Sequence, residues 1–274
     1  MGHLHSSLEQ VYIKNVGKRK EMKIPEITLK DKVVLITGAS RGAGAVYALA
    51  CAQAGADVAV FARSSLADTA EMIKAETGKA VLTINGDMGN IKDIERMVET
   101  TVEHYGKLDV LVNNAGICVP SKLIETTEEQ WDRSIGINLK GYFFACKYAA
   151  KKMIPRKSGV IINIGSEVSH VGAAEESVYC AAKGGTFIMS QSLAIELGRF
   201  NIRVVTLCPG PLDTPMAAPW LEDPETKKEL LDMSLLGRIG KPEDVAPTLV
   251  LLASDAARNV TGCSWSVDCG ALAQ

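Results

Sequence analysis

The chain of 274 residues lacks four things: an excess of charge, a long apolar run, paired cysteine motifs and abundant aromatic side chains. Aromatic residues make up 5% and hydrophobic residues 47%, an ordinary globular composition. Its 30 basic and 32 acidic side chains give a net charge of -2, which provides no field to attract nucleic acid or an anionic membrane. No apolar run approaches the ~20 residues of a membrane span. We therefore expect neither nucleic acid nor a membrane as partner.

The cysteines contain no C-x-x-C pair and no zinc spacing, so we expect no metal site. There are seven of them, mostly in apolar surroundings: Cys51, Cys118, Cys146, Cys180, Cys208, Cys263 and Cys269. An odd number of scattered thiols is typical of reduced core cysteines. This favours a reducing compartment, and we predict a cytoplasmic protein.

Residues 1–30 differ from the rest of the chain and are interpreted as an N-terminal extension. They contain a basic patch at Lys14, Lys18, Arg19, Lys20 and Lys23 but no apolar segment typical of a secretory signal. A solvated flexible arm is the favoured interpretation, and a tail that contacts other subunits or an expression remnant are the alternatives. No repeat or linker divides residues 31–274, which we expect to form one domain.

Short apolar runs alternate with amphipathic stretches from Lys32 onward. The runs, which predict strands buried on both faces, are Val33–Ile36, Val58–Phe61, Ala80–Ile84, Val110–Val112, Val160–Ile164, Ile202–Leu207 and Ser264–Val267. Helices are predicted at Gly42–Ala54, Ala67–Glu76, Ile91–Tyr105, Glu128–Ile154, Val178–Arg199 and Pro242–Ala253. Capping-box patterns start the fourth of these at Thr126 and Thr127. Alternation of this kind predicts an α/β fold, a Rossmann-like doubly wound parallel sheet in three layers.

In such sheets the ligand lies at the carboxyl ends of the strands. The first strand is followed by Thr37-Gly38-Ala39-Ser40-Arg41-Gly42-Ala43-Gly44 and then a helix. Glycines at Gly38, Gly42 and Gly44 let the backbone approach a pyrophosphate, whose charge the N–H groups of the helix start stabilise. A tight turn is the alternative. The position between strand and helix favours dinucleotide binding.

The second strand ends without the acid that would bind the ribose 2′-hydroxyl of NAD. Ala62 stands at that position, followed by Arg63 and Ser64, and Arg41 approaches from the glycine loop. Arginine forks onto phosphate oxygens, so this set suits a 2′-phosphate. Unless the two arginines are only solvated, NADP(H) is favoured over NAD(H).

Each remaining strand end also carries residues suited to a ligand. These are Asp87 and Met88 after the third strand, Asn114, Ala115 and Gly116 after the fourth, and Ser166 after the fifth. Pro209, Gly210, Leu212 and Thr214 follow the sixth. Ordinary turn chemistry is the alternative for several of them. Residues 211–236, which contain Met216, Trp220 and Leu221, are predicted to form an irregular, mobile lid.

Tyr179 and Lys183 lie four residues apart at the start of a long apolar segment. On a helix they share one face, about 5–6 Å apart at Cβ. A free tyrosine titrates near pH ~10, and a nearby cation favours its phenolate, so we expect Lys183 to lower the pKa of Tyr179. Surface helices also carry such pairs by chance. Together with the strand ends, the pair indicates proton transfer at an alcohol or carbonyl oxygen.

From about Leu29 onward the chain resembles the short-chain dehydrogenase/reductase family. The resemblance rests on the Thr37–Gly44 loop, Asp87, Asn113–Gly116, Asn138, Ser166, Tyr179, Lys183, Pro209-Gly210, Thr214 and the ending Gly237-Arg-Ile-Gly-Lys-Pro-Glu-Asp-Val-Ala. It departs at Ala43, where a bulkier residue is commonest, and at Cys269, which breaks a usual double glycine. The family match spans nearly the whole chain after the extension.

The resemblance implies a set of roles. Tyr179 would be the general acid or base, Lys183 would also bind the nicotinamide ribose, and Ser166 would hold the substrate oxygen. Asn138 would support a water between Lys183 and solvent, and Thr214 would contact the nicotinamide carboxamide. A homotetramer, or a dimer, is expected from the family and from the apolar residues on nearly all faces of Val178–Arg199.

An NADP(H)-dependent carbonyl reductase or alcohol dehydrogenase is the favoured function. Sugar, polyol or steroid dehydrogenases, a 3-oxoacyl thioester reductase and a non-catalytic NADP(H) sensor are alternatives. A serine hydrolase is disfavoured because Ser166 lies in no G-x-S-x-G motif. Glu167, Glu175 and Glu176 make the substrate segment acidic, which suits a neutral polar or cationic substrate. His170 is either a substrate contact or a surface residue.

Overall fold

The computed structural model describes residues 24–273 of the chain. Residues 1–23 of the predicted flexible extension, which spans residues 1–30, lie outside the described residues. The end of the expected extension packs against the domain: Leu29 is fully buried, and its N–H donates to the carbonyl of Ala54 at 2.8 Å.

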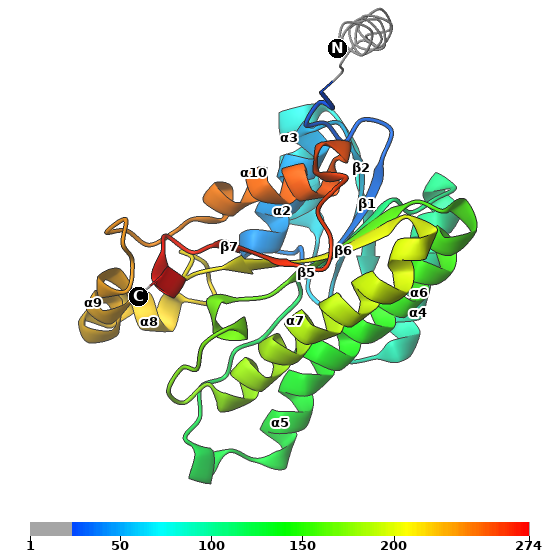
Figure 1. Ribbon diagram of the computed structural model, residues 1–274. Helices are drawn as coiled ribbons and strands as arrows, with labels where there is room; N and C mark the ends of the chain where they lie inside the picture. The colour runs from blue at the N-terminus through cyan, green and yellow to red at the C-terminus, as the bar shows by residue number, and fades with distance from the viewer. Residues whose placement is uncertain (1–23, 274) are drawn as a thin grey trace, which may run out of the picture.

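A seven-stranded parallel sheet forms the middle layer (Figure 1). Its strands are β1 (Val33–Thr37), β2 (Asp57–Ala62), β3 (Leu82–Asn85), β4 (Val110–Asn113), β5 (Gly159–Ile164), β6 (Ile202–Pro209) and β7 (Ser264–Val267). All seven predicted strands are confirmed, with ends shifted by no more than two residues. They lie in the order β3-β2-β1-β4-β5-β6-β7.

The strand order reverses at β1, which pairs with β2 on one side and with β4 on the other. Leu35 aligns with Ala59 of β2 and with Leu111 of β4, and all five residues of β1 are buried. Helices leave β1 and β4 toward opposite faces, so a crevice opens beyond their carboxyl ends. The predicted site residues follow these two strands and the neighbouring strands β2, β3, β5 and β6.

Helices cover both faces of the sheet (Figure 1). The longer ones are α2 (Gly42–Gln53), α3 (Ala67–Thr77), α4 (Ile91–Tyr105), α5 (Glu128–Ile135), α6 (Tyr142–Met153), α7 (Ser177–Leu197), α8 (Ala218–Glu222), α9 (Pro224–Asp232) and α10 (Pro242–Ala253). Single-turn helices are η1 (Leu123–Glu125), η3 (Ile154–Arg156), η4 (Glu167–Ser169), η5 (Gly198–Phe200), η6 (Asp255–Ala257) and η7 (Ala271–Ala273). One core joins the sheet to α2, α3 and α10, and a second joins it to α4, α6 and α7. This is the predicted three-layer arrangement. Among the described residues, no helix is both long and apolar enough to cross a membrane.

The helix predicted over Glu128–Ile154 is interrupted. Residues Gly136–Gly141 form a π-helical turn (η2) between α5 and α6. Gly141 packs so closely on the loop after β3 that an added Cβ would lie 2.5 Å from the carbonyl oxygen of Met88. The capping box at Thr127 forms with Gln130, as predicted. The one predicted at Thr126 does not, because Thr127 is the N-cap residue of α5; the Thr126 hydroxyl donates to the carbonyl of Lys122.

The prediction of an irregular segment at residues 211–236 was wrong in part, because α8 and α9 lie within it. Asp223 caps α9 by accepting from the N–H of Thr226 at 2.9 Å, and Pro224 occupies the first helical position. An aspartate followed by proline is a common helix start. In Figure 1 both helices lie at one end of the sheet, beside the C-terminus and away from the two main helical layers.

Candidate active site

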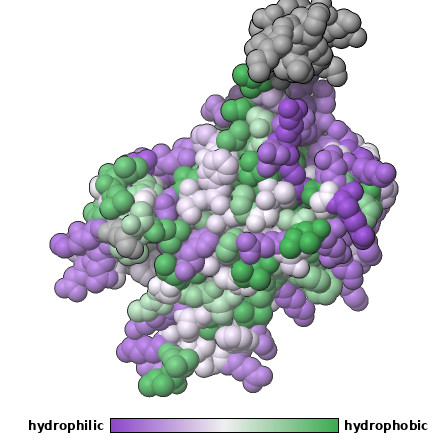
Figure 2. Space-filling view, in the orientation of Figure 1, coloured by the Kyte–Doolittle hydropathy of each residue, from purple (hydrophilic) through white to green (hydrophobic). Residues whose placement is uncertain are grey.

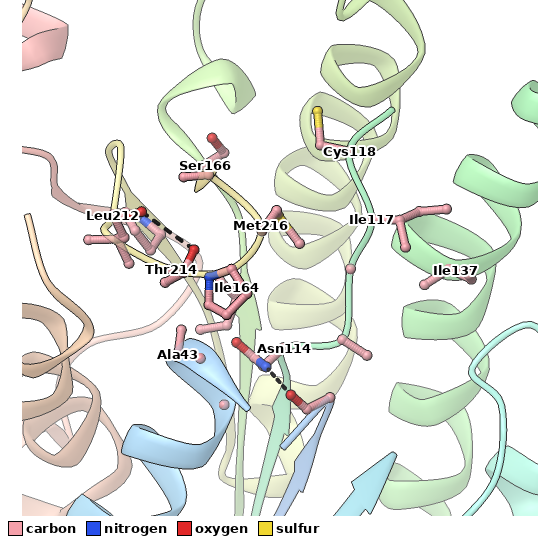
Figure 3. Close-up of a pocket in the computed structure, with 18 of the residues that line it drawn as sticks. Ala43, Asn114, Ile117, Cys118, Ile137, Ile164, Ser166, Leu212, Thr214 and Met216 are labelled. Atoms are coloured by element: carbon pink, nitrogen blue, oxygen red, sulfur yellow. Dashed lines mark hydrogen bonds between the residues drawn. The ribbon is translucent and has the colours of Figure 1, made fainter. Parts of the chain in front are cut away.

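A cavity of about 720 Å³ opens at the carboxyl ends of the strands. Every predicted catalytic or cofactor-binding residue except Asn138 lines it: Gly38, Ser40, Arg41, Gly42, Gly44, Arg63, Ser64, Asp87, Met88, Asn114, Ala115, Gly116, Ser166, Tyr179, Lys183, Pro209, Gly210, Leu212 and Thr214. Figure 3 shows part of the cavity lining, with Asn114 low in the cavity, Leu212 and Thr214 on one side and Cys118 on the other. The volume is that of a typical small-molecule site.

Backbone packing forms the floor of the cavity at the glycine loop. Gly38 has φ +67°, and a Cβ on it would lie 2.5 Å from the Cα of Ala115. A Cβ on Gly44 would lie 2.3 Å from the carbonyl oxygen of Gly38. No other residue type fits either position without displacing the backbone that lines the cavity.

Thr37 and Asn114 hold this floor together. The Thr37 hydroxyl accepts from the N–H groups of Asn114 and Ala115 at 3.0 and 3.1 Å. The Asn114 amide donates to the carbonyls of Thr37 and Gly38. Sequence reasoning assigned no role to Thr37. Its position at the end of β1, directly before the first glycine, could have indicated that it supports the glycine loop.

The start of α2 points its free N–H groups toward the cavity. Arg41 is the N-cap residue in extended conformation, and its side chain makes no capping hydrogen bond. The first N–H groups of a helix attract anions when no side chain satisfies them. This loop fits a dinucleotide pyrophosphate.

Two arginines and two serines surround the end of β2. The Ser64 hydroxyl donates to that of Ser40 at 2.8 Å, and Arg63 lies 3.8 Å from the Asp87 carboxylate. Arg63 is 69% exposed, so solvent weakens this ion pair and leaves the guanidinium available to a ligand. Ala62 is buried at the end of the strand. The group has the composition of a phosphate site.

Tyr179 and Lys183 lie on the first turns of α7, as predicted. The Lys183 ammonium lies 5.6 Å from the Tyr179 ring centroid and 5.1 Å from that of Tyr142. It donates to the carbonyl of Ile164 at 2.7 Å. Burial lowers the pKa of Lys183 to about 8. The contacts of the ammonium are thus one carbonyl and two aromatic rings.

The pKa of Tyr179 shifts in the direction opposite to the prediction. Burial raises it well above its usual value because removal from water penalises the phenolate, and the carboxylates of Glu167 and Glu176 add to the increase. Burial thus favours the protonated phenol of Tyr179.

Ser166 lies at the tip of β5, where η4 begins. Its hydroxyl donates to the Glu167 carboxylate at 2.7 Å and accepts from the N–H of Val168 at 3.4 Å. The Ser169 hydroxyl in turn accepts the N–H of Ser166. Glu167 lines the cavity beside it. The sequence indicated an acidic segment here but not this contact.

Asn138 lies in the π-helical turn behind the cavity wall. Its side-chain oxygen accepts from the N–H of Ile117 at 3.0 Å, and its amide donates to the Ile117 carbonyl at 2.8 Å. Its backbone carbonyl accepts from the Thr186 hydroxyl on α7. Asn138 thus fixes the loop after β4 and connects it to the helix that carries Tyr179.

The remaining walls of the cavity form its substrate end. Cys118, Val119 and Ile137 line one side, Glu167 and Glu176 the acidic side, and Met216 and Trp220 the lid side. Burial raises the pKa of Glu176 and raises that of Cys118 to about 12. Glu175 is exposed and does not line the cavity.

His170 is not among the cavity residues. Its Nε2 lies 3.8 Å from the Cys208 sulfur, and its ring packs 4.7 Å from that of Phe187. A direct substrate contact by His170, the weaker of the two expectations, therefore lacks support. Within the described range, no three His, Cys, Asp or Glu residues form a group that could hold a metal ion.

Comparison with known proteins agrees with this geometry. A family model described as enoyl-(acyl carrier protein) reductase matches residues 38–271. L-rhamnose 1-dehydrogenase (NAD(P)(+)) of Azotobacter vinelandii is 38% identical over 249 residues, covering 88% of this chain and 97% of that protein. The chain belongs to the short-chain dehydrogenase/reductase family. It is thus an oxidoreductase of a family that uses NAD(P) cofactors.

Other members of this family are about equally similar. The 3-oxoacyl-acyl-carrier-protein reductase of Thermotoga maritima is 38% identical over 247 residues, covering 88% of this chain and 98% of that protein. A crystal structure of a short-chain type dehydrogenase/reductase from Mycobacterium marinum has a TM-score of 0.86 at 31% identity, covering 90% of this chain and 98% of that one. A structure from Beutenbergia cavernae, with NADP bound at low occupancy, has a TM-score of 0.87 at 30% identity and covers 90% and 99%.

Proposed function

We propose that this chain is an NADP(H)-dependent oxidoreductase that interconverts a carbonyl compound and an alcohol, with Tyr179 as the general acid or base. The observation that carries the proposal is that Ser166, Tyr179 and Lys183 line the same cavity as the glycine loop. A dinucleotide on that loop would extend its nicotinamide toward these three side chains. A binding protein without turnover would not need them.

The shape of the glycine loop supports dinucleotide binding, because Gly38 and Gly44 leave no room for a Cβ. The pyrophosphate would bind at the start of α2, and Asp87 would meet the adenine amino group. Thr214, whose hydroxyl donates to the Leu212 carbonyl at 3.4 Å, would contact the nicotinamide carboxamide. When bound, the cofactor supplies or accepts the hydride.

The choice of NADP(H) over NAD(H) rests on the residues after β2. Arg41, Arg63 and Ser64 line the cavity, and Ala62 stands where an acid would repel a 2′-phosphate. Two guanidinium groups provide bidentate donors for that phosphate. The ion pair of Arg63 with Asp87 would give way to it.

The proton chemistry divides among three side chains. Tyr179 donates its phenol proton to the substrate oxygen during carbonyl reduction and takes the proton back during alcohol oxidation. Lys183 stabilises the resulting phenolate and, near its pKa of about 8, can return a proton. Ser166 donates a hydrogen bond to the substrate oxygen as negative charge develops there.

The substrate end favours a neutral polar or cationic substrate. Glu167 and Glu176 line it, and an anionic substrate would be repelled in a poorly solvated space by whichever of the two is ionised. Met216 and Trp220 of the lid provide an apolar surface opposite. Hydroxyl-rich carbonyl compounds, such as sugars and polyols, therefore belong with simple ketones and aldehydes among the first candidates.

Assembly into a homotetramer, or a dimer, is proposed from the outer face of α7. Ile188 and Ile195 are 60% and 84% exposed there, and Phe143 on α6 is 45% exposed. Figure 2 shows apolar side chains over this face. Exposed isoleucines of this kind are typical of subunit interfaces. A cytoplasmic location is proposed from the seven free thiols, three of them buried.

A turnover screen tests the proposed reaction. The enzyme is assayed with diverse carbonyls and alcohols, including sugars and carboxylates, with NADPH and NADH in parallel. We expect reduction with NADPH, and Tyr179→Phe should lower kcat by about 10³-fold while NADPH still binds, since general acid catalysis contributes roughly 10²–10⁴-fold. Undiminished turnover in Tyr179→Phe would contradict the mechanism, and a preference for NADH would contradict the role of the arginines.

A further inference from the structure

The Ser166 hydroxyl directs its proton away from the substrate position. It donates to the Glu167 carboxylate at 2.7 Å, a short charge-assisted hydrogen bond. A serine hydroxyl has one proton and two lone pairs. While that proton is on the hydrogen bond to Glu167, Ser166 has none to donate to a substrate oxygen.

Protonation of Glu167 would reverse this hydrogen bond. A carboxylic acid donates its own proton, and the Ser166 oxygen can accept it. The serine proton is then free to turn into the cavity toward the oxygen that also receives the Tyr179 proton. Both residues line the cavity, so no movement of the backbone is required.

The surroundings of Glu167 make protonation accessible. Burial raises the pKa of Glu167, and the negative charges of Glu176 and Asp268 raise it further, while the hydrogen bond from Ser166 lowers it. Glu167 also acts on Tyr179 of α7 and on Cys208 of β6, raising the pKa of each. Lys183 also lines the cavity, and its ammonium donates to the Ile164 carbonyl.

We propose that Glu167 is a positioning residue that sets the direction of the Ser166 proton: the carboxylate keeps that proton from the substrate, and the carboxylic acid releases it. The inference rests on the proposed carbonyl reduction. During reduction, the hydride comes from the cofactor and the transferred proton from Tyr179. Glu167 transfers nothing to the product and acts only through Ser166.

The test is the pH profile of kcat/KM for carbonyl reduction by the full chain. In the wild type, kcat/KM should fall about tenfold per pH unit above the pKa of Glu167, because a single proton is lost. Glu167→Gln replaces the acid with an amide that does not titrate, so this limb of the pH profile should disappear. The pH dependence of kcat/KM that arises from the titration of Lys183 should remain. Glu175→Gln, in the same segment but exposed, is the matched control and should keep the wild-type profile.

Two kinetic outcomes would overturn the proposal. Glu167→Gln could retain the wild-type limb, or it could lose activity at every pH to the level of Ser166→Ala, where loss of one such donor costs about 10²–10³-fold. NADPH binding and thermal unfolding of each variant show whether the fold is intact.

A second measurement needs no turnover and stands even if the chain reduces no carbonyl. NMR titration of the Glu167 carboxyl should show a higher pKa in Ser166→Ala than in the wild type, since the hydroxyl stabilises the carboxylate. An unchanged pKa would overturn the Glu167 assignment. Absence of turnover with a shifted pKa would instead refute the proposed function alone.

Discussion

The two ends of the cavity are built differently. At the cofactor end, backbone atoms form the wall: glycines in left-handed or close-packed positions, fixed by Thr37 and Asn114. At the substrate end, side chains from separate elements form it, among them Glu167, Glu176 and Trp220. A substitution in a wall formed by backbone atoms disrupts the packing of the loop itself. A substitution in a wall formed by side chains alters that side chain and leaves the backbone in place. The cofactor end therefore tolerates little change, and the substrate end can be adapted.

The sharpest test of this contrast is Gly38→Ala at the cofactor end. The new Cβ would lie 2.5 Å from the Cα of Ala115, and alanine is strained at φ +67°. Overpacking of this kind costs about 1–3 kcal/mol and displaces the loop. We expect NADPH affinity to fall about 100-fold, with a lower Tm, measured by calorimetric titration and thermal unfolding.

The control is Gly172→Ala, at an exposed glycine between η4 and α7 that does not line the cavity. A Cβ there would meet nothing within 4 Å. NADPH affinity and Tm should both stay at wild-type values. Equal losses in the two variants would remove the distinction between the ends.

Lys183 lies where the two ends meet and allows a test by pH. Its folded-state pKa of about 8 is below the unfolded value of 10.5, so the unfolded chain binds more protons between these values and stability rises with pH. The free energy of unfolding of the wild type, relative to Lys183→Met, should increase by about 3 kcal/mol from pH 7 to pH 10.5. Urea unfolding at several pH values measures this difference. A pH-independent difference would mean that Lys183 is not desolvated.

Glu176→Gln should have the smallest effect and only at the substrate end. Removing one half-buried negative charge should improve kcat/KM for anionic carbonyl substrates by about fivefold, roughly 1 kcal/mol, and leave NADPH affinity unchanged. Steady-state kinetics with matched neutral and carboxylate substrates would measure it. A change in NADPH affinity would show that the two ends are coupled.

Most of the fold follows from local patterns in the sequence. The bounds of α4 and α10 match their predictions, because each has clear end signals: Asn90 caps α4 by accepting the Lys92 N–H, and Gly106 ends it in the left-handed conformation. The predicted cofactor-binding residues gather around one cavity because parallel strands bring their carboxyl ends together. These features depend on neighbours in sequence or on topology.

The features that were missed depend on distant contacts. The pKa of Tyr179 depends on burial, to which residues from several elements contribute, and not on its spacing from Lys183 alone. The Ser166–Glu167 bond depends on side-chain rotamers, which adjacency does not specify. The helices α8 and α9 were not predicted, because the prolines and charged residues near their starts are also typical of irregular segments.

The π-helical turn at Gly136–Gly141 acts as a one-residue insertion in an otherwise continuous helix. Each helical residue advances about 100°, so one extra residue rotates α5 by that amount relative to α6. Deleting Leu139 or Lys140, between Asn138 and Gly141, would restore an uninterrupted helix and rotate Asn138, together with α5, relative to α6 and so away from Ile117. The loop after β4 would then lose its two hydrogen bonds to that side chain. The phase of one helix thus sets the position of a loop that belongs to the sheet.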